Sequence, residues 1–251
     1  MNTLDGKTVI VTGGTRDIGR SCSIKLAEAG AKIVVNYLNN KEAGEETIAT
    51  VEKTGAAAIL VKGDMTKKDD VDNLVAVTRE AFGDKIHGLV NNVGGLVARK
   101  KILEMDEDFL NHVMALNFNS TFLTTQAVVP HMPSGGSIVN LASLAGRDGG
   151  GGGASAYACG KAAVMTFTRA MAKELGPQGI RVNALCPGMI DTTFHDTFTP
   201  DEARRNVEAS VPLRRQGRPD DCGDLVAYLA SDASAYITGA NIDINGGMFF
   251  S

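Results

Sequence analysis

The sequence predicts an α/β fold in which one doubly wound parallel sheet lies between two layers of helices. Short apolar segments rich in β-branched residues alternate with amphipathic segments along the chain, which is typical of strand–helix–strand units. The apolar segments are apolar throughout, as strands buried on both faces require. Glycine or proline follows most of the amphipathic segments, where a helix would end.

Three strand–helix units are expected in the first part of the chain. A strand at 8–12 leads into a glycine-rich turn, and a helix then begins at Ile18 and ends at Gly30, with apolar residues at helical spacing. Two further strands and two further helices follow in alternation, and glycines stop both helices: strands 32–37 and 57–62, helices 41–54 and 67–82.

The second part of the chain repeats this alternation. The expected strands are 87–91, 137–141, 181–185 and 241–244, and the expected helices are 106–129, 156–175 and 220–230. Pro130 ends the first of these helices and Gly176-Pro177 closes the second. Five consecutive glycines at 149–153 lie between a strand and a helix, where an active-site loop is expected. No linker or internal repeat divides the chain, so we expect one domain over residues 1–251.

Composition and charge narrow the classes of function. The formal net charge of −4 gives no electrostatic support for nucleic-acid binding. No apolar run reaches about 18 residues, so no membrane span is expected. Residues 1–7 are polar, unlike a signal or transit peptide. The four cysteines and four histidines lack metal-ligand spacing. We therefore expect no metal, reduced thiols and a cytoplasmic location.

The turn after the first strand reads Thr12-Gly13-Gly14-Thr15-Arg16-Asp17-Ile18-Gly19. A glycine-rich turn between a strand and a helix brings backbone N–H groups and the positive end of the helix to a pyrophosphate. The second strand ends in Asn36-Tyr37 with no carboxylate for the ribose hydroxyls of NAD. Arg16 offers a donor for a 2′-phosphate, so NADP(H) is favoured over NAD(H). The alternatives are a solvated Arg16 and a purely structural Asn36.

Tyr157 and Lys161 are four residues apart on the expected helix 156–175, so they share one helix face about 6 Å apart. A free tyrosine, with a pKa of about 10, is a poor acid or base near neutrality. An ammonium about 5 Å away would lower that pKa by about two units. Ser143 lies upstream, beyond the glycine run. An isolated Tyr–Lys pair is often just a pair of surface residues. Its occurrence together with a dinucleotide-binding turn favours a catalytic role.

These features together resemble the short-chain dehydrogenase/reductase family, over nearly the whole chain and with a Rossmann-type fold. The motifs that support the resemblance, in chain order, are the Thr12–Gly19 turn, Asn91-Asn92-Val93-Gly94, Asn117, Ser143, Tyr157 with Lys161, Pro187-Gly188, and Asp243-Ile244-Asn245-Gly246-Gly247. The resemblance implies a carbonyl reductase or alcohol dehydrogenase, and it implies a homotetramer.

The resemblance also implies residue roles. Tyr157 would protonate the carbonyl oxygen, Ser143 would hydrogen-bond it, and Lys161 would bind the nicotinamide ribose and lower the Tyr157 pKa. Asn117 would position a water that links Lys161 to solvent. The expected cofactor-binding residues are Gly13, Thr15, Arg16, Ile18, Gly19, Asn36, Asp64, Met65, Asn91, Val93, Gly94, Tyr157, Lys161, Pro187, Gly188, Ile190 and Thr192.

Three departures from the family pattern stand out. Asp17 occupies a position that is usually glycine, and we expect it to be the N-cap of the first helix, with its carboxylate on backbone N–H groups. Val93 replaces an alanine. Ser143 and Tyr157 are fourteen residues apart, one more than expected, and the glycine run can absorb the extra residue.

Three segments on the substrate side, residues 91–100, 149–153 and 190–195, resemble reductases of 4-deoxy-5-hexoseulose uronate. This acidic keto sugar is derived from alginate and is reduced to 2-keto-3-deoxygluconate. A small acidic sugar needs a cation over a compact pocket. The candidate substrate residues are Arg99, Lys100, Arg147, Gly149 and His195. Each cation has a solvated loop position as its alternative.

Large parts of the chain also resemble 3-oxoacyl-[acyl-carrier-protein] reductases. Arg204-Arg205 and Arg214-Arg215 would then form a basic face for an acidic carrier. A third alternative is a dinucleotide-binding sensor without activity, a class that typically lacks the Ser/Tyr/Lys set.

Overall fold

The computed structural model describes residues 4–250, so residues 1–3 of the polar N-terminal segment lie outside it. Seven parallel strands form one sheet in the order β3-β2-β1-β4-β5-β6-β7. The strands are β1 (Thr8–Val11), β2 (Lys32–Tyr37), β3 (Ala58–Lys62), β4 (Gly88–Asn91), β5 (Ser137–Leu141), β6 (Arg181–Pro187) and β7 (Asn241–Ile244). The predicted doubly wound α/β fold is confirmed, and every predicted strand is present.

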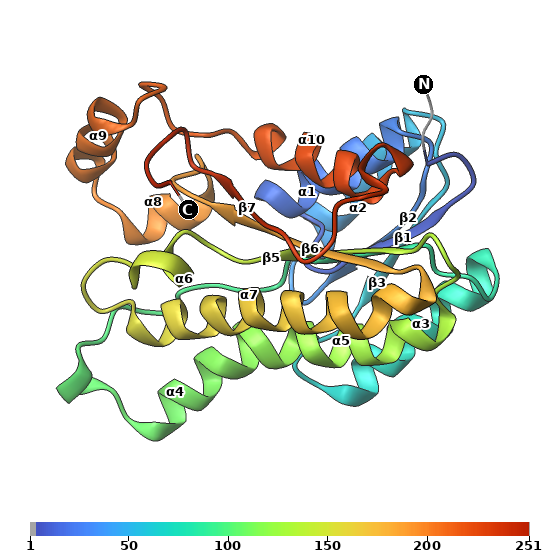
Figure 1. Cartoon of the computed structure of the whole chain (residues 1–251), viewed down its shortest axis with the longest axis horizontal. Helices are drawn as coiled ribbons and strands as arrows, with labels where there is room; N and C mark the ends of the chain where they lie inside the picture. The colour runs from blue at the N-terminus through green and yellow to red at the C-terminus, as the bar shows by residue number, and fades with distance from the viewer. Residues whose placement is uncertain (1–3, 251) are drawn as a thin grey trace.

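Helices cover both faces of the sheet (Figure 1). On one face lie α1 (Asp17–Glu28), α2 (Lys41–Glu52) and α10 (Pro219–Ala230). On the other face lie α3 (Lys68–Phe82), α4 (Glu107–Met114), α5 (Ser120–Val128) and α7 (Ser155–Leu175). The short helices α6 (Ala145–Asp148), α8 (Thr193–Phe198) and α9 (Asp201–Ser210) follow β5 and β6.

The expected helix 106–129 is interrupted by a π-helical turn, Ala115–Asn119, between α4 and α5. The expected helix at 220–230 begins one residue earlier, at Pro219, which is favourable in the first turn of a helix. Sequence periodicity did not reveal α6, α8 and α9, because each is short and has no continuous apolar stripe.

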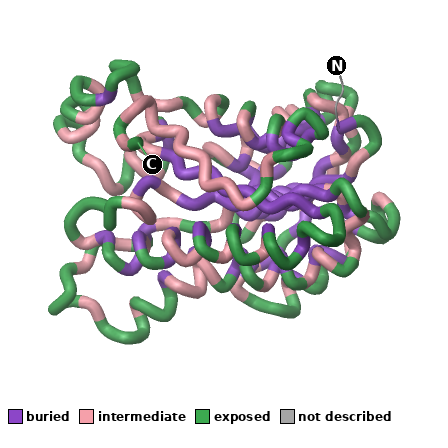
Figure 2. The backbone as a smooth tube through the Cα atoms, in the orientation of Figure 1, coloured by how far each residue is buried: buried purple, intermediate pink, exposed green. Residues whose placement is uncertain are grey.

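Two apolar layers enclose the sheet, and the buried strands run through the middle of the molecule (Figure 2). One layer joins the sheet to α1 and α10 through residues such as Leu26 and Val226. The other joins it to α3, α5 and α7 through residues such as Leu74 and Leu175. The strands are therefore buried on both faces, as their continuous apolar character predicts.

Helices α1 and α10 approach each other closely at a glycine. A Cβ built on Gly223 would lie 2.4 Å from Ser21 Oγ and 3.0 Å from the Ser21 carbonyl carbon. Ser21 Oγ also donates a hydrogen bond of 2.7 Å to Asp220 at the start of α10. The position of α1, and of the turn that precedes it, thus depends on a side chain being absent at residue 223.

We expect Gly223→Ala to lower the free energy of unfolding by about 1–3 kcal/mol, because overpacking forces backbone shifts that the added methyl group does not offset. Urea denaturation followed by circular dichroism measures the change. Gly176→Ala is the matched control, since its backbone is helical and no atom lies within 4 Å of a Cβ there. Equal stability of the two variants would contradict the close α1–α10 approach.

Candidate active site

A cavity of about 840 Å³ opens where β1, β4, β5 and β6 end. In a parallel sheet this edge collects the loops that follow the strands, and β1 has β2 on one side and β4 on the other. This is the point at which the chain reverses the direction in which strands are added, where ligands bind in such sheets. The predicted site residues that line the cavity are Gly13, Arg16, Ile18, Gly19, Val93, Gly94, Arg99, Ser143, Tyr157, Lys161, Pro187, Gly188, Ile190, Thr192 and His195.

Two amide side chains fix the glycine-rich turn between β1 and α1. Asn36 Oδ1 accepts a hydrogen bond of 3.1 Å from the Gly13 N–H. Asn92 Nδ2 donates to the Thr12 and Gly13 carbonyl oxygens at 3.1 and 3.0 Å. A Cβ on Gly19 would lie 2.2 Å from the Gly13 oxygen, so only glycine fits there. The turn leaves the first turn of α1 open to the cavity, a suitable cradle for a pyrophosphate.

The expectation that Asn36 faces the cofactor is wrong for its side chain. Asn36 is buried, and its Nδ2 donates to the Gly63 carbonyl oxygen at 3.0 Å, so both ends of the amide bind the protein's own backbone. The residues that line the cavity after β2 are Leu38, Asn39 and Asn40. None of these three is acidic, which agrees with the reasoning that this end of the cavity has no carboxylate for the ribose hydroxyls.

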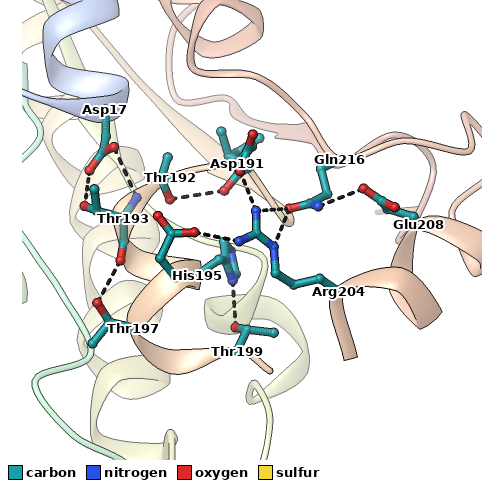
Figure 3. A network of polar contacts seen from close by, with 12 residues as sticks. Asp17, Asp191, Thr192, Thr193, His195, Thr197, Thr199, Arg204, Glu208 and Gln216 are labelled. Carbon is teal, nitrogen blue, oxygen red and sulfur yellow. Dashed lines mark hydrogen bonds and ion pairs between the residues drawn. The ribbon is translucent and has the colours of Figure 1, made fainter. Parts of the chain in front are cut away.

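Asp17 is not the N-cap of α1 as predicted. The N-cap is Arg16, which makes no side-chain capping bond, and Asp17 is the first residue of the helix. Asp17 has a φ of 49°, a left-handed conformation that favours glycine. Its carboxylate accepts hydrogen bonds from the Thr193 hydroxyl at 2.6 Å and the Thr193 N–H at 3.2 Å, at the start of α8 (Figure 3). The carboxylate therefore binds a distant backbone N–H group rather than its own helix.

Tyr157 and Lys161 lie one turn apart on α7, and Ser143 follows β5. The Lys161 Nζ lies 6.0 Å from the centre of the Tyr157 ring and donates a hydrogen bond of 2.6 Å to the Leu141 carbonyl oxygen. Ser143, Tyr157 and Lys161 line the same cavity, whereas the fourth catalytic candidate, Asn117, does not. The structure thus brings together the acid, the ammonium and the hydroxyl that the sequence placed in separate segments.

Burial dominates the titration of the catalytic candidates. It raises the pKa of Tyr157, and the neighbouring Ser143 hydroxyl opposes part of that rise. Burial also lowers the pKa of Lys161 to about 8. Burial and the Ser143 hydroxyl account for the shift of the Tyr157 pKa and Lys161 is not among its causes, so the expectation that Lys161 lowers the Tyr157 pKa stays a prediction. A protonated phenol at neutral pH is suited to donating a proton.

Asn117 supports the neighbouring turn from within the π-helical segment. Its Oδ1 accepts from the Gly95 N–H at 3.0 Å, and its Nδ2 donates to the Gly95 and Val113 carbonyl oxygens. A Cβ on Gly94 would lie 2.7 Å from Lys161 Nζ and 2.8 Å from Asn117 Oδ1. Asn117 therefore holds the 94–95 turn beside Lys161, while its expected role in positioning a water remains a prediction.

Besides Asn36, four expected cofactor residues do not line the cavity. Met65 is buried in the core. Asp64 accepts hydrogen bonds from the Thr66 N–H and hydroxyl. Asn91 is buried and bonds Asn140 in the next strand. Thr15 is also buried. These four residues pack against or bond other parts of the chain near the ends of the strands.

The substrate side of the cavity contains Arg99 and His195. Arg99 Nη1 donates to the Gly152 carbonyl oxygen at 2.9 Å, and its Nε donates to the Phe198 carbonyl oxygen at 3.4 Å. His195 Nδ1 lies 2.8 Å from Thr199 Oγ1. Burial, with help from the nearby Arg204 and Arg99 charges, lowers the pKa of His195, so the imidazole is neutral at pH 7.

The other three substrate candidates lie away from the cavity. Arg147 is tied to Asp243 at 2.6 Å and to the Asn241 carbonyl oxygen, so its guanidinium joins α6 to β7. Lys100 pairs with Asp106 and covers the Phe109 ring. Gly149 ends α6 in a left-handed conformation. The prediction that these three residues contact the substrate is therefore wrong: Arg147 and Lys100 form ion pairs within the chain, and Gly149 ends a helix.

Sequence reasoning missed several residues of the cavity wall. Phe194 lies 6.0 Å from the Tyr157 ring, centre to centre, and Gly150 and Gly151, rather than Gly149, line the cavity. Asn92 was noted as part of a motif but not as the residue that fixes the turn. The segment 189–198 has no apolar periodicity, so only the resemblance of residues 190–195 to the uronate reductases indicated a role for it.

No helix between residues 4 and 250 is both long and apolar enough to cross a membrane. Over the same residues, no group of three or more His, Cys, Asp or Glu side chains is arranged to hold a metal ion.

The chain is similar to known proteins over nearly its whole length. The family model described as enoyl-(acyl carrier protein) reductase matches residues 13–249. A 3-oxoacyl-[acyl-carrier-protein] reductase of Synechocystis sp. is 36% identical over 99% of both chains.

Two solved structures share the fold. The NADH-dependent reductase A1-R′ responsible for alginate metabolism is 30% identical, with a TM-score of 0.91 over 100% of both chains. A short-chain dehydrogenase from Burkholderia cenocepacia in complex with NADP is 31% identical, with a TM-score of 0.91 over 98% of this chain and 99% of the other. The chain belongs to the short-chain dehydrogenase/reductase family of nicotinamide-dependent oxidoreductases.

Proposed function

We propose that this protein is an NADP(H)-dependent reductase of a small acidic keto sugar such as 4-deoxy-5-hexoseulose uronate, which it converts to 2-keto-3-deoxygluconate. The observation that supports this most directly is a guanidinium on the wall of the catalytic cavity. Arg99 lines the same cavity as Tyr157 and is anchored by two backbone carbonyl oxygens. Those two bonds use two of its five N–H donors, which leaves donors for a substrate carboxylate.

The rest of this wall suits a compact polar substrate. Gly150 and Gly151 expose backbone rather than side chains, so a sugar ring can approach closely. His195 is neutral at pH 7 and adds a hydrogen-bonding group without charge. Phe194 packs near the Tyr157 ring and limits the length of the pocket. Similarity to a reductase of alginate metabolism also supports an acidic sugar.

The chain's own residues supply the proton chemistry of the reduction. When bound, the dinucleotide supplies the hydride. Tyr157, a phenol that is protonated at neutral pH, donates its phenolic proton to the carbonyl oxygen. The Ser143 hydroxyl donates a hydrogen bond to the same oxygen and orients it. Lys161 remains beside the phenol, where the Leu141 carbonyl oxygen accepts a hydrogen bond from its ammonium group and Gly94, which has no side chain, leaves room for it.

The preference for NADP(H) rests on Arg16. Its side chain is 74% exposed at the edge of the cavity, near the carboxylate-free segment Leu38–Asn40. A guanidinium there can pair with a 2′-phosphate, and no acidic residue of that segment repels the phosphate. The similar solved structures include both an NADP complex and an NADH-dependent enzyme.

A second candidate function is reduction of 3-oxoacyl groups on an acyl-carrier protein. Its support is the identity with reductases of that class over nearly the whole chain. The basic docking face expected for it is weakened in the structure. Arg204 pairs with Asp191 and Asp196, and Arg215 pairs with Asp221, so these cations are neutralised within the chain.

We also propose a homotetramer in the cytoplasm. Leu110 and Phe122 are partly exposed on the outer helices α4 and α5, which suits association between copies. The four cysteines are free thiols, as a reducing compartment would keep them.

Lys161→Met should abolish reduction and yet raise stability. Its folded pKa of about 8 lies below the usual value, so the unfolded chain binds more protons between about pH 8 and 10.5 and wild-type stability rises with pH across that window. Removing the buried charge should stabilise the protein at pH 7 by about 1–2 kcal/mol, after the loss of the bond to Leu141.

Denaturation midpoints measured from pH 7 to 10.5 test this. The rise with pH should disappear in Lys161→Met, while single-turnover reduction falls by at least about 100-fold. An unchanged pH slope would contradict a desolvated ammonium at this position.

Arg16→Met should weaken NADPH binding by about tenfold and leave NADH binding within about twofold, because only NADPH offers a phosphate to the guanidinium. Dissociation constants are measured from the fluorescence of each reduced dinucleotide. Arg20→Met is a matched control: Arg20 lies on the next turn of α1, where it bonds Thr50 of α2. Equal losses for both dinucleotides would refute the assignment of Arg16 to the 2′-phosphate.

Purified protein should oxidise NADPH rapidly with 4-deoxy-5-hexoseulose uronate and slowly with an acetoacetyl thioester, with Tyr157→Phe as the inactive blank. Arg99→Met should raise KM for the uronate by about tenfold with little change in kcat, because the pair with the carboxylate forms in both ground and transition states. Its effect on an uncharged carbonyl substrate of similar size should be within about twofold. Rapid turnover of the thioester alone would establish the second candidate function instead.

A further inference from the structure

The segment 191–216, which includes α8 and α9, forms a flap beside the cavity. Its two ends meet at the base: Asp191 N–H donates to the Gly217 carbonyl oxygen at 2.8 Å, and Gly217 N–H donates to the Met189 carbonyl oxygen at 2.9 Å. The flap thus leaves and rejoins the body at one place. Between these two ends, the flap is held by ion pairs within it and by contacts with the walls of the cavity.

One arginine holds the flap together internally (Figure 3). Arg204 on α9 pairs with Asp196 on α8 at 2.6 Å and with Asp191 at the base. Its Nη2 also donates to Gln216 Oε1 at 3.0 Å, and Gln216 in turn donates to Glu208. Because these bonds join α8, α9 and both ends of the segment, the flap is expected to move as one unit.

Contacts at three flap residues join this unit to the cavity walls. Arg99 donates to the Phe198 carbonyl oxygen at 3.4 Å, and Phe194 packs near the Tyr157 ring. The Thr193 hydroxyl accepts a bond of 3.2 Å from Arg16 Nη1 and donates the shortest bond, 2.6 Å, to Asp17, which also accepts from the Thr193 N–H. Thr193 and Phe194 are consecutive, so the contact with the dinucleotide turn and the contact with the catalytic tyrosine are one residue apart on the flap.

Asp17 is unfavourable for its own turn. It adopts a φ of 49°, which disfavours any side chain, and it makes no capping bond to α1. Its carboxylate contacts Thr193 and, less closely, Arg16, whose Nε lies 4.0 Å away. A carboxylate in the first turn of α1 also lies where the dinucleotide's phosphates are cradled. The contact with Thr193 is therefore the benefit that the structure shows for this side chain.

We propose that Asp17 is a positioning residue that latches the flap to the dinucleotide turn. Asp17 and Thr193 both line the cavity, so their bond joins two of its walls. While the latch is closed, the flap retains the dinucleotide and Phe194 stays against Tyr157. The dinucleotide leaves when the latch opens, so the Asp17–Thr193 bond sets the release rate.

Variants at Thr193 and Asp17 distinguish the effect of the Thr193–Asp17 hydrogen bond from the effect of the Asp17 charge. Thr193→Val removes the hydroxyl donor and keeps the carboxylate, so it should accelerate NADPH release about fivefold. Asp17→Asn keeps an oxygen acceptor for the Thr193 N–H and removes the charge near the phosphates, so release should be unchanged or slower. Asp17→Gly removes the latch and relieves the strained φ, so it should accelerate release without lowering the thermal midpoint.

Stopped-flow fluorescence of bound NADPH, displaced by excess NADP⁺, measures the release rate. Hydrogen exchange of the dinucleotide-free protein gives a readout that is independent of turnover: the 191–210 amides should exchange faster in Thr193→Val and Asp17→Gly than in the wild type. Thr193→Val in the Asp17→Gly background should add no further acceleration, because the bond is already absent.

Thr197→Val is the matched control, since the Thr197 hydroxyl bonds only the Thr193 carbonyl oxygen within α8. It should leave the release rate unchanged. Additive effects of Thr193→Val and Asp17→Gly would overturn the latch. The latch would also be overturned if neither Thr193→Val nor Asp17→Gly changed the NADPH release rate or the hydrogen exchange of the 191–210 amides.

Discussion

The site depends on the turn between β1 and α1 being held from both sides of β1. The sheet places β2 and β4 next to β1, and each neighbour supplies one amide: Asn36 from β2 and Asn92 from the end of β4. Both bond the backbone at residues 12–13. Because Gly19 packs against the Gly13 oxygen, the turn cannot relax without moving α1. The strand order thus explains why the cradle lies at this edge of the sheet.

This constraint extends outward through α1. Gly223 lets α10 pack closely on α1, and Ser21 bonds the first turn of α10. One turn earlier, at the first residue of α1, Asp17 reaches the flap through Thr193. One helix therefore connects the core of one face of the sheet, the dinucleotide turn and the cover of the substrate pocket. Packing changes far from the chemistry would alter the cavity through this helix.

The sequence predicted the strands well because each is a short, continuously apolar segment with a clear turn after it. It also identified Ser143, Tyr157 and Lys161, whose chemistry is specific. It failed where partners are distant in the chain. Arg147 looked like a free loop cation, but Asp243 lies 96 positions away and becomes its neighbour only when β7 joins the sheet. Asp17 looked like a cap, since its real partner on α8 is 176 positions away. The partners of a polar side chain are set by contacts between distant segments, and local sequence patterns carry no information about those contacts.

Three departures from ordinary folding rules border the same cavity. Asp17 has a left-handed backbone, Lys161 buries an ammonium, and a π-helical turn at Asn117 interrupts a long helix. Each is unfavourable for its own element, and Gly94 must lack a side chain for Lys161 and Asn117 to lie where they do. Selection for stability alone would remove such features one by one. Their clustering around one cavity is an argument for function there that does not depend on similarity to any other protein.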